Sequence, residues 1–168
     1  MTQLDRIWNG WRSQYVNEAG SRVPGAVGSV FTQILHSGLS DEASFILWRG
    51  VHTFAILNAF PYTSGHLMVL PYRELGTLEE LSQLEADELW PAVTDAVRAV
   101  KQAYQPGGVN VGINLGRAAG GSVTEHLHVH VVPRWSGDGN FMTAVAEART
   151  LPEPLSQSAT KLRAAWPN

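Results

Sequence analysis

Three of the six histidines in this chain stand at alternate positions of one short segment, as His126, His128 and His130. Successive side chains of a β-strand point to opposite faces, so this spacing predicts three imidazoles on one face and the apolar residues between them on the other. Neighbouring histidines would lie about 6.6 Å apart, at a rise of roughly 3.3 Å per residue. One phosphate-sized group could therefore meet two or three of the rings.

The histidine row is open to three interpretations. It can line a solvated strand face without any role, it can bind a metal through neutral imidazole, or it can supply a nucleophile and acid–base groups. The chain has no cysteine and no His-Glu-x-x-His or His-x-x-Glu-His spacing that would complete a metal set. We favour catalysis, because an ordinary histidine pKa of about 6.5 leaves one ring neutral for attack while a protonated neighbour stabilises negative charge.

The segment directly before the histidines, residues 116–122, contains three glycines and ends on Ser122. Glycine lets the backbone approach a ligand closely and turn its N–H groups toward phosphate oxygens, and a serine hydroxyl adds a donor. The loop has neither the Gly-Lys-Ser/Thr of a P-loop nor the Gly-x-Gly-x-x-Gly of a dinucleotide-binding fold. Alone it would suggest a simple turn, but its position before three histidines favours phosphate binding.

The elements that must hold these residues are predicted from short apolar runs and the residues that bound them. Runs that end at glycine or proline predict strands, and the first three follow one another closely enough for an antiparallel meander. The predicted strands comprise residues 45–48, 53–57, 67–70, 109–115 and the histidine segment. With the helix described next, they predict an α+β fold, a five-stranded antiparallel sheet with one long packed helix.

Helical patterns occur in three places. Ser82 and Glu85 have the spacing of a capping box, and the apolar periodicity after them predicts a long helix over residues 83–104. Apolar residues of segment 3–18 recur at helical spacing, and helical stretches return after residue 144. We therefore expect three parts along the chain. They are an N-terminal helix and linker (1–27), a catalytic domain (28–142) and a C-terminal helical extension (143–168).

Size and composition narrow the class of protein. The 168 residues, of which 44% are hydrophobic, suffice for one domain with a core. A formal charge of −3 offers no excess of cations for long nucleic acid, so any nucleotide partner is expected to be small. No apolar run approaches a membrane span, the start of the chain lacks a secretory pattern, and cysteine is absent. We expect a soluble cytoplasmic protein with no membrane partner.

The segment His126–Val132 has the pattern His-φ-His-φ-His-φ-φ, with φ apolar, and resembles the signature of the histidine triad (HIT) superfamily of nucleotide hydrolases and transferases. A second likeness is the segment Leu57–Arg73, which resembles the superfamily's Asn-to-Pro-x-x-Gly-His-x-x-φ-x-Pro segment, and a third is Asn110–Gly116. The likeness covers residues 28–142. The longer segment Gly120–Phe141 is most similar to the actinobacterial diadenosine tetraphosphate phosphorylase-like branch.

This resemblance implies roles for particular residues. His128 would be the nucleophile that attacks the α-phosphorus and forms a nucleotidyl-histidine intermediate. His126 and His130 would orient it and hydrogen-bond phosphate oxygens, and His66 would support the three from behind. The implied substrate-binding residues are Asn58 near the ribose, Asn114 near the phosphates, Gly121 and Ser122 in the phosphate loop, and Glu125 beside the phosphate or water that resolves the intermediate.

The resemblance also implies a homodimer whose two sheets join into one. Many relatives carry a zinc-binding Cys-x-x-Cys near the start of the domain, where this chain has Ser29-Val30-Phe31-Thr32. We therefore expect no structural zinc, with packing in its place. No metal and no cofactor of the protein's own is expected, and Mg²⁺ is a candidate companion of the nucleotide.

The leading hypothesis is an enzyme that cleaves dinucleoside polyphosphates of the diadenosine tetraphosphate type, by phosphorolysis or hydrolysis. Both reactions share the first step and differ in the acceptor of the nucleotidyl group. Two alternatives stay open. One is a nucleotide-binding sensor with little turnover, and the other is a metallohydrolase built on the strand histidines.

Overall fold

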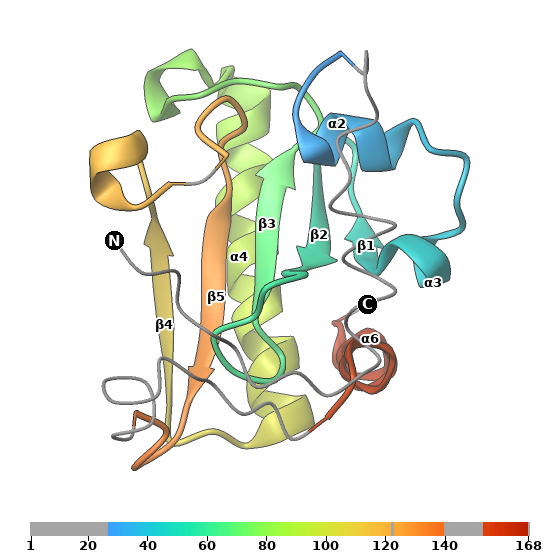
Figure 1. Cartoon of the computed structure of the whole chain (residues 1–168), viewed down its shortest axis with the longest axis vertical. Coiled ribbons are helices and arrows are strands. Elements are labelled where there is room, and N and C mark those ends of the chain that lie inside the picture. The colour runs from blue at the N-terminus through green and yellow to red at the C-terminus, as the bar shows by residue number, and fades with distance from the viewer. Residues whose placement is uncertain (1–26, 122, 140–152, 168) are drawn as a thin grey trace, which may run out of the picture.

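The fold is built on one antiparallel sheet. In the computed structural model, which describes residues 27–121, 123–139 and 153–167, five strands pair in the order β1-β2-β3-β5-β4 (Figure 1). The strands are β1 (Ile46–Arg49), β2 (Thr53–Leu57), β3 (Leu67–Pro71), β4 (Gly108–Ile113) and β5 (Val129–Arg134). The first three form the predicted meander, and β5 lies between β3 and β4.

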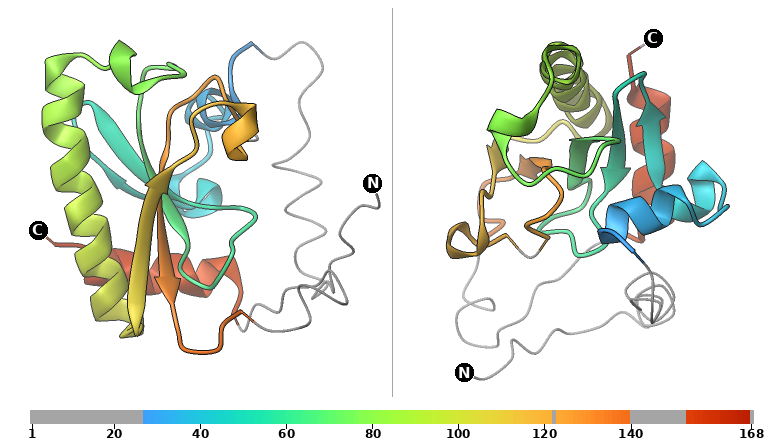
Figure 2. Two further views of the ribbon diagram at one scale, coloured as in Figure 1. Left: turned by 90° about the vertical axis from the view of Figure 1, so that its left-hand side faces the viewer. Right: turned by 90° about the horizontal axis from the view of Figure 1, so that it is seen from above.

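Different helices cover the two faces of the sheet. The long helix α4 (Gln83–Tyr104) crosses one face with α6 (Leu155–Ala165) beside it, and the short helix α2 (Val30–Leu35) lies on the other face (Figure 2). Neighbouring side chains of a strand point to opposite faces, so each strand contributes to two cores. In β2, for example, Ala55 packs in the core under α4, whereas Phe54 packs in the core under α2.

Helix α4 begins and ends where the sequence predicts. Its N-cap is Ser82, whose hydroxyl accepts the N–H of Glu85 at 3.3 Å while the Glu85 carboxylate accepts the Ser82 N–H at 2.8 Å. The same carboxylate lies 2.8 Å from Nη2 of Arg73, just after β3. The hydrogen bond from Arg73 is the main cause that lowers the pKa of Glu85 to about 2. The ion pair with Arg73 thus also connects the start of the helix to the end of β3.

Two short helices that the sequence does not predict precede the sheet. They are α2 and α3 (Asp41–Ser44), each with a serine as its N-cap, Ser29 and Ser40. Six and four residues are too few to show a helical period, so the apolar pattern does not reveal them. The first strand consequently begins at Ile46, because Phe45 ends α3 with a φ of 58° in the left-handed region.

The β-strand in the histidine segment is shorter than the alternation of histidines and apolar residues predicts. Strand β5 begins at Val129, so His130 lies within the strand whereas His126 and His128 precede it. The alternation holds inside the strand, since Val129 and Val131 are buried in the core under α4 and His130 points to the other face. The first two histidines are therefore positioned by contacts other than the sheet ladder.

Helix α6 packs into the same core as α4. Leu155 and Leu162 are buried there, and Trp166 stacks on Trp48 of β1 with 5.7 Å between ring centroids. The predicted helix at residues 3–18 and the boundary near residue 143 lie outside the described residues, so the division into three parts stays a prediction. In the part of the chain that the structure describes, no helix is long and apolar enough to cross a membrane.

Candidate active site

His128 is buried just before β5, with one ring nitrogen already engaged. The residue is 6% exposed, and its Nδ1 lies 2.7 Å from the backbone oxygen of His126. A carbonyl oxygen can only accept, so Nδ1 carries the proton and Nε2 keeps its lone pair in the neutral ring. That is the tautomer a nucleophilic imidazole needs.

His126 is held through both ring nitrogens. Its Nε2 donates to the backbone oxygen of Pro71 at 2.8 Å, so its Nδ1 is the acceptor and receives a hydrogen bond from the Ser29 hydroxyl at 2.7 Å. The residue is completely buried, and Phe31 of α2 meets the ring edge-on with 5.4 Å between ring centroids. The ring therefore supports the site from inside the protein.

His130 belongs to a chain of hydrogen bonds that comes from the loop between β2 and β3. The Tyr62 N–H donates to Nδ1 of His66 at 3.0 Å, and Nε2 of His66 donates to Nδ1 of His130, also at 3.0 Å. The neutral His130 ring therefore carries its proton on Nε2. His66 is fully buried, whereas His130 is partly exposed, and its ring lies 4.8 Å from that of His128. A ring with a proton to donate thus stands next to a ring with a free lone pair.

The surroundings lower the pKa of all three histidines in the motif. For His126 and His128, burial is the largest cause, because it removes water from the charged form. For His130, burial and then the neighbouring His128 lower the pKa to about 4. An ordinary histidine titrates at about 6.5, so all three rings are neutral at neutral pH. This agrees with the tautomers assigned from their partners.

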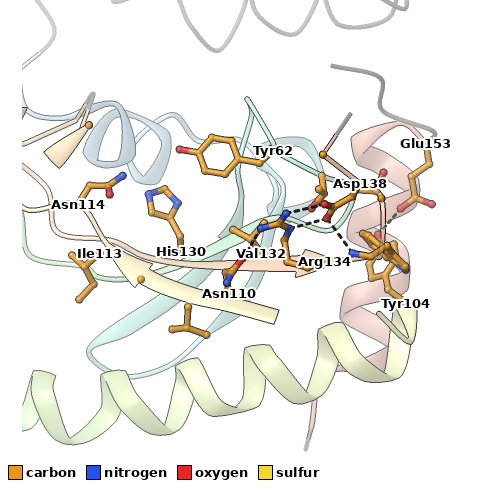
Figure 3. A pocket seen from close by; sticks show the side chains of 18 of the residues that line it. Tyr62, Tyr104, Asn110, Ile113, Asn114, His130, Val132, Arg134, Asp138 and Glu153 are labelled. Carbon is orange, nitrogen blue, oxygen red and sulfur yellow. Dashed lines mark hydrogen bonds and ion pairs between the residues drawn. The ribbon is translucent and has the colours of Figure 1, made fainter. Parts of the chain in front are cut away.

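A cavity of about 1190 Å³ opens beside His130 and runs along β5 (Figure 3). Tyr62, His130 and Asn114 lie at one end, and Tyr104 and Glu153 lie at the other (Figure 3). Pockets for small ligands usually measure roughly 300–1,000 Å³, so this cavity has room for an extended ligand. One flank of the histidine cluster therefore opens to a cavity.

The loop that carries His66 depends on a glycine. Gly65 has a φ of 79°, and a Cβ at this position would lie 2.5 Å from the Tyr104 ring. A side chain here would have to overcome both the left-handed backbone and the contact with the ring. Gly65 thus allows the loop to place His66 where it reaches His130.

Two predicted substrate-binding residues lie at the histidine cluster. The backbone N–H of Asn58 donates to the carbonyl of His66 at 3.0 Å, so the end of β2 is joined to the start of β3 at this histidine. Asn114 follows β4 and lines the cavity together with His130. Both asparagines are partly buried, as residues that meet a ligand would be.

The other predicted substrate-binding residues belong to the glycine loop. Gly121 is packed so closely that a Cβ would lie 3.1 Å from the Gly116 oxygen, which shows how tightly this loop turns. Ser122 lies outside the described residues. Glu125 is exposed beside His126, and its negative charge favours the protonated form of that ring.

Sequence analysis missed the contacts of Ser29 and Glu74. Ser29 bonds to His126, and Glu74 bonds to Ser29. The only signal was the pair of hydroxyl residues, Ser29 and Thr32, in the place of two cysteines, and we expected that segment to act by packing. Phe31 does pack, with 5.4 Å between its ring centroid and that of His128, but hydrogen bonds make the closer link.

An antiparallel five-stranded sheet with a long helix on one face, and three histidines gathered at the start of one inner strand, define a histidine triad protein. The family described as HIT domain matches residues 41–137, which is more than half of the chain. This chain belongs to the HIT family, as the resemblance of its histidine motif implies.

Individual relatives agree with this assignment. The chain is 45% identical to a protein named AP-4-A phosphorylase from Mycobacterium tuberculosis, over 98% of this chain and 85% of that protein. It is 30% identical to an asymmetrical bis(5'-nucleosyl)-tetraphosphatase from Schizosaccharomyces pombe, over 56% of this chain and 52% of that protein. Among solved structures, a Zn-bound histidine triad family protein from Mycobacterium smegmatis matches with a TM-score of 0.66 and 28% identity, over 82% of this chain and 92% of that one.

The zinc of that relative makes the donor atoms around His126 relevant. In the place where many relatives have Cys-x-x-Cys, Ser29 and Thr32 offer hydroxyls, and one oxygen of Glu74 accepts hydrogen bonds from both residues. Zinc prefers thiolate, imidazole and carboxylate ligands, so the hydroxyls of Ser29 and Thr32 do not fit it in place of the two cysteines. Within residues 27–121, 123–139 and 153–167, no group of three or more His, Cys, Asp or Glu side chains is arranged to hold a metal.

Proposed function

We propose that this protein cleaves a phosphoanhydride bond of dinucleoside polyphosphates, such as diadenosine tetraphosphate, through a nucleotidyl-histidine intermediate. The observation that carries the proposal is the tautomer of His128, whose Nδ1 lies 2.7 Å from the His126 oxygen while Nε2 keeps its lone pair. The names of two relatives, a phosphorylase and a tetraphosphatase, support the substrate class.

In the first step, Nε2 of His128 attacks the α-phosphorus, a P–N bond forms, and the bond from phosphorus to the bridging oxygen breaks. With diadenosine tetraphosphate the leaving group is ATP, which takes the electron pair of that bond. His130, which lines the cavity, donates its Nε2 proton in a hydrogen bond to a phosphate oxygen as negative charge develops. His126 and His66 hold the other two rings in the required tautomers.

In the second step, an acceptor attacks the phosphorus and the P–N bond breaks, which restores the lone pair on His128. Phosphate as the acceptor gives ADP, and water gives AMP. We favour phosphate, because the relative named as a phosphorylase shares 45% identity over 98% of this chain, against 30% over 56% for the tetraphosphatase. The protein is then a nucleotidyltransferase with phosphate as the second substrate.

The remaining predicted residues complete the proposed substrate site. Asn58 contacts the ribose and Asn114 the phosphates, in keeping with their places beside His66 and on the cavity wall. Gly121 and Ser122 supply donors from the phosphate loop. Glu125 positions the phosphate that resolves the intermediate.

The test is incubation with diadenosine tetraphosphate, with and without inorganic phosphate, followed by separation of the nucleotides. We expect ADP and ATP that form only when phosphate is present. ATP and AMP formed in water alone would show hydrolysis instead. With labelled substrate and no acceptor, mass spectrometry of a digest should find one nucleotidyl group, attached to His128.

Two histidine variants make a matched pair for this test. His128→Ala is expected to lower turnover by about 10⁴-fold or more and to abolish the adduct, because it removes the nucleophile. His52→Ala should retain both, since His52 lies in the turn between β1 and β2, across the sheet from β4. Full activity of His128→Ala would overturn the proposal. Binding without turnover by the unaltered protein would favour a nucleotide sensor.

We also propose that the protein forms a homodimer through β4. This strand is at the edge of the sheet, residues 110–112 are exposed, and Val111 is 44% exposed. An edge strand leaves N–H and C=O groups unpaired, so β4 of a second copy can pair with it and join the two sheets. Sedimentation is expected to show a dimer that Val111→Lys weakens. A protein that stays monomeric at every concentration would contradict this proposal.

A further inference from the structure

A polar cluster outside the cavity surrounds the start of helix α2. It consists of Ser29, Thr32 and Glu74, and Glu74 follows β3 by three residues. One carboxylate oxygen of Glu74 accepts the backbone N–H of Ser29 at 2.7 Å and the hydroxyl of Thr32 at 2.6 Å. These hydrogen bonds lower the pKa of Glu74, with the bond from Thr32 as the largest cause. The carboxylate is therefore charged at neutral pH and fixes the N-cap of the helix.

The cluster reaches the histidine motif through one hydroxyl. Ser29 Oγ accepts the N–H of Thr32 at 3.2 Å, and its own proton is directed to Nδ1 of His126 at 2.7 Å. The Thr32 hydroxyl donates its proton to Glu74. The Ser29 hydroxyl therefore donates its own proton to Nδ1 of His126. Ser29 is 1% exposed and His126 is fully buried, so water does not replace this bond.

From His126 the connection continues to the nucleophile. The carbonyl oxygen of His126 accepts Nδ1–H of His128 at 2.7 Å, and this bond leaves the lone pair on Nε2. The other nitrogen of His126 is bonded to the Pro71 oxygen at 2.8 Å. The end of β3 and the residues just after it therefore hold His126 from two sides, directly through Pro71 and indirectly through Glu74.

A glycine permits the close approach of the carboxylate. Gly28 has a φ of 92°, in the left-handed region, and a Cβ there would lie 2.8 Å from Oε2 of Glu74. A side chain at this position would push the carboxylate away from the backbone N–H of Ser29. The left-handed glycine at position 28 thus leaves room for the Glu74 carboxylate to accept the Ser29 N–H.

We propose that Glu74 is a positioning residue for the reaction, acting through Ser29 and His126 on the tautomer and orientation of His128. This inference rests on the proposed function, because it takes His128 as the nucleophile. Glu74 does not touch the substrate. It fixes Ser29, Ser29 fixes the ring of His126, and the carbonyl of His126 fixes the ring that attacks phosphorus.

The first experiment compares Glu74→Ala, Glu74→Gln and the control Glu79→Ala with the unaltered protein. Glu79 is an exposed carboxylate in the 3₁₀ turn Leu78–Glu80. We expect Glu74→Ala to lower kcat by about 10- to 100-fold with KM changed less than about twofold, because a misplaced nucleophile slows the chemical step. Glu74→Gln keeps an acceptor oxygen and should recover most of kcat, and Glu79→Ala should have no effect.

The second experiment separates positioning from general stability. Long-range ¹H–¹⁵N spectra of the histidine rings should show the Nε2–H form of His126 and the Nδ1–H form of His128 in the unaltered protein, and mixtures of both forms in Glu74→Ala. In the His126→Ala background, the Glu74→Ala substitution should lower kcat no further, because the two residues act in one chain. If Glu74→Ala does not fold, Thr32→Val removes one bond to the carboxylate and should lower kcat by about fivefold.

Three outcomes would overturn the proposal. They are unchanged tautomers in Glu74→Ala, an unchanged kcat, or a further loss of kcat in the His126→Ala background. The ring spectra need no substrate, so they test positioning even if the nucleotidyl adduct on His128 is never found. An adduct on His128 with tautomers that ignore Glu74 would support the proposed function and reject the role of Glu74.

Discussion

The two histidines that flank the proposed nucleophile are held in opposite ways. His126 is completely buried, and both of its ring nitrogens are bonded to protein atoms, the carbonyl of Pro71 and the hydroxyl of Ser29. His130 is partly exposed and lines the cavity, and the bond to its Nδ1 comes from another imidazole, that of His66. One flank is closed and the other opens to the cavity.

In the proposed reaction, this difference separates a supporting ring from one that contacts the substrate. A ring whose two nitrogens are both bonded to buried protein groups must break a bond before it can contact a phosphate. A ring with one nitrogen still available can donate to phosphate at no such cost. The histidine motif is symmetrical in sequence, and its surroundings make the two flanks unequal.

The largest effect on activity is expected at the open flank. His130→Ala should lower kcat by about 10²- to 10³-fold, because it removes a donor aimed at charge that develops in the transition state. Stability should fall by about 1–3 kcal/mol, because the variant removes the acceptor of the hydrogen bond from buried His66. Steady-state rates and thermal melting of the same preparation check both statements. An equal loss of kcat in His130→Ala and in the control His52→Ala would show that the open flank has no special role in the reaction.

The closed flank should lose more stability than the open flank, in addition to the loss of rate expected from its contact with His128. His126→Ala leaves the Ser29 hydroxyl and the Pro71 carbonyl without their partner in a buried place. Each unpaired buried group costs about 1–3 kcal/mol, so we expect a loss of about 2–6 kcal/mol in the free energy of unfolding. Urea denaturation measures this loss. An unchanged midpoint would mean that the bonds of this ring contribute nothing to the fold.

A glycine variant tests the support of the open flank alone. Gly65→Ala places a methyl group against Tyr104 and strains a left-handed backbone, so we expect a loss of about 1–3 kcal/mol together with a displaced His66. Gly38→Ala is the matched control, because Gly38 also has a positive φ, of 75°, but a Cβ there would meet nothing within 4 Å. Denaturation of the two variants should differ by the cost of the contact. Equal values would show that Tyr104 moves aside freely.

Acid pH should destabilise the protein through the open flank. The pKa of His130 is lowered to about 4, so the unfolded chain binds a proton at about pH 6.5 that the folded protein refuses until about pH 4. Stability is therefore lost as the pH falls through this window. His130→Ala should lose part of that dependence in a series of urea titrations. A variant with the same pH dependence as the unaltered protein would show that another group is responsible.

The sheet and its long helix could be predicted because their signals are local. Residues 53–57 and 83–104 match β2 and α4 at both ends, since apolar runs and a capping box mark them. Helices α2 and α3 could not be predicted, because six and four residues carry no period. The strand character of His126 and His128 was overestimated for a related reason. Alternation is compatible with an extended segment that hydrogen-bonds to loops instead of to strands.

The order of residues along the chain is enough to reveal three alternate histidines, the glycine loop before them and membership of the HIT family. It does not reveal which nitrogen of each ring is protonated. For His126 and His130 it depends on partners far away in the chain, since Ser29 is 97 positions from His126 and His66 is 64 positions from His130. A proton on an imidazole goes to the nitrogen that faces an acceptor, and folding alone brings donor and acceptor within 3 Å of each other.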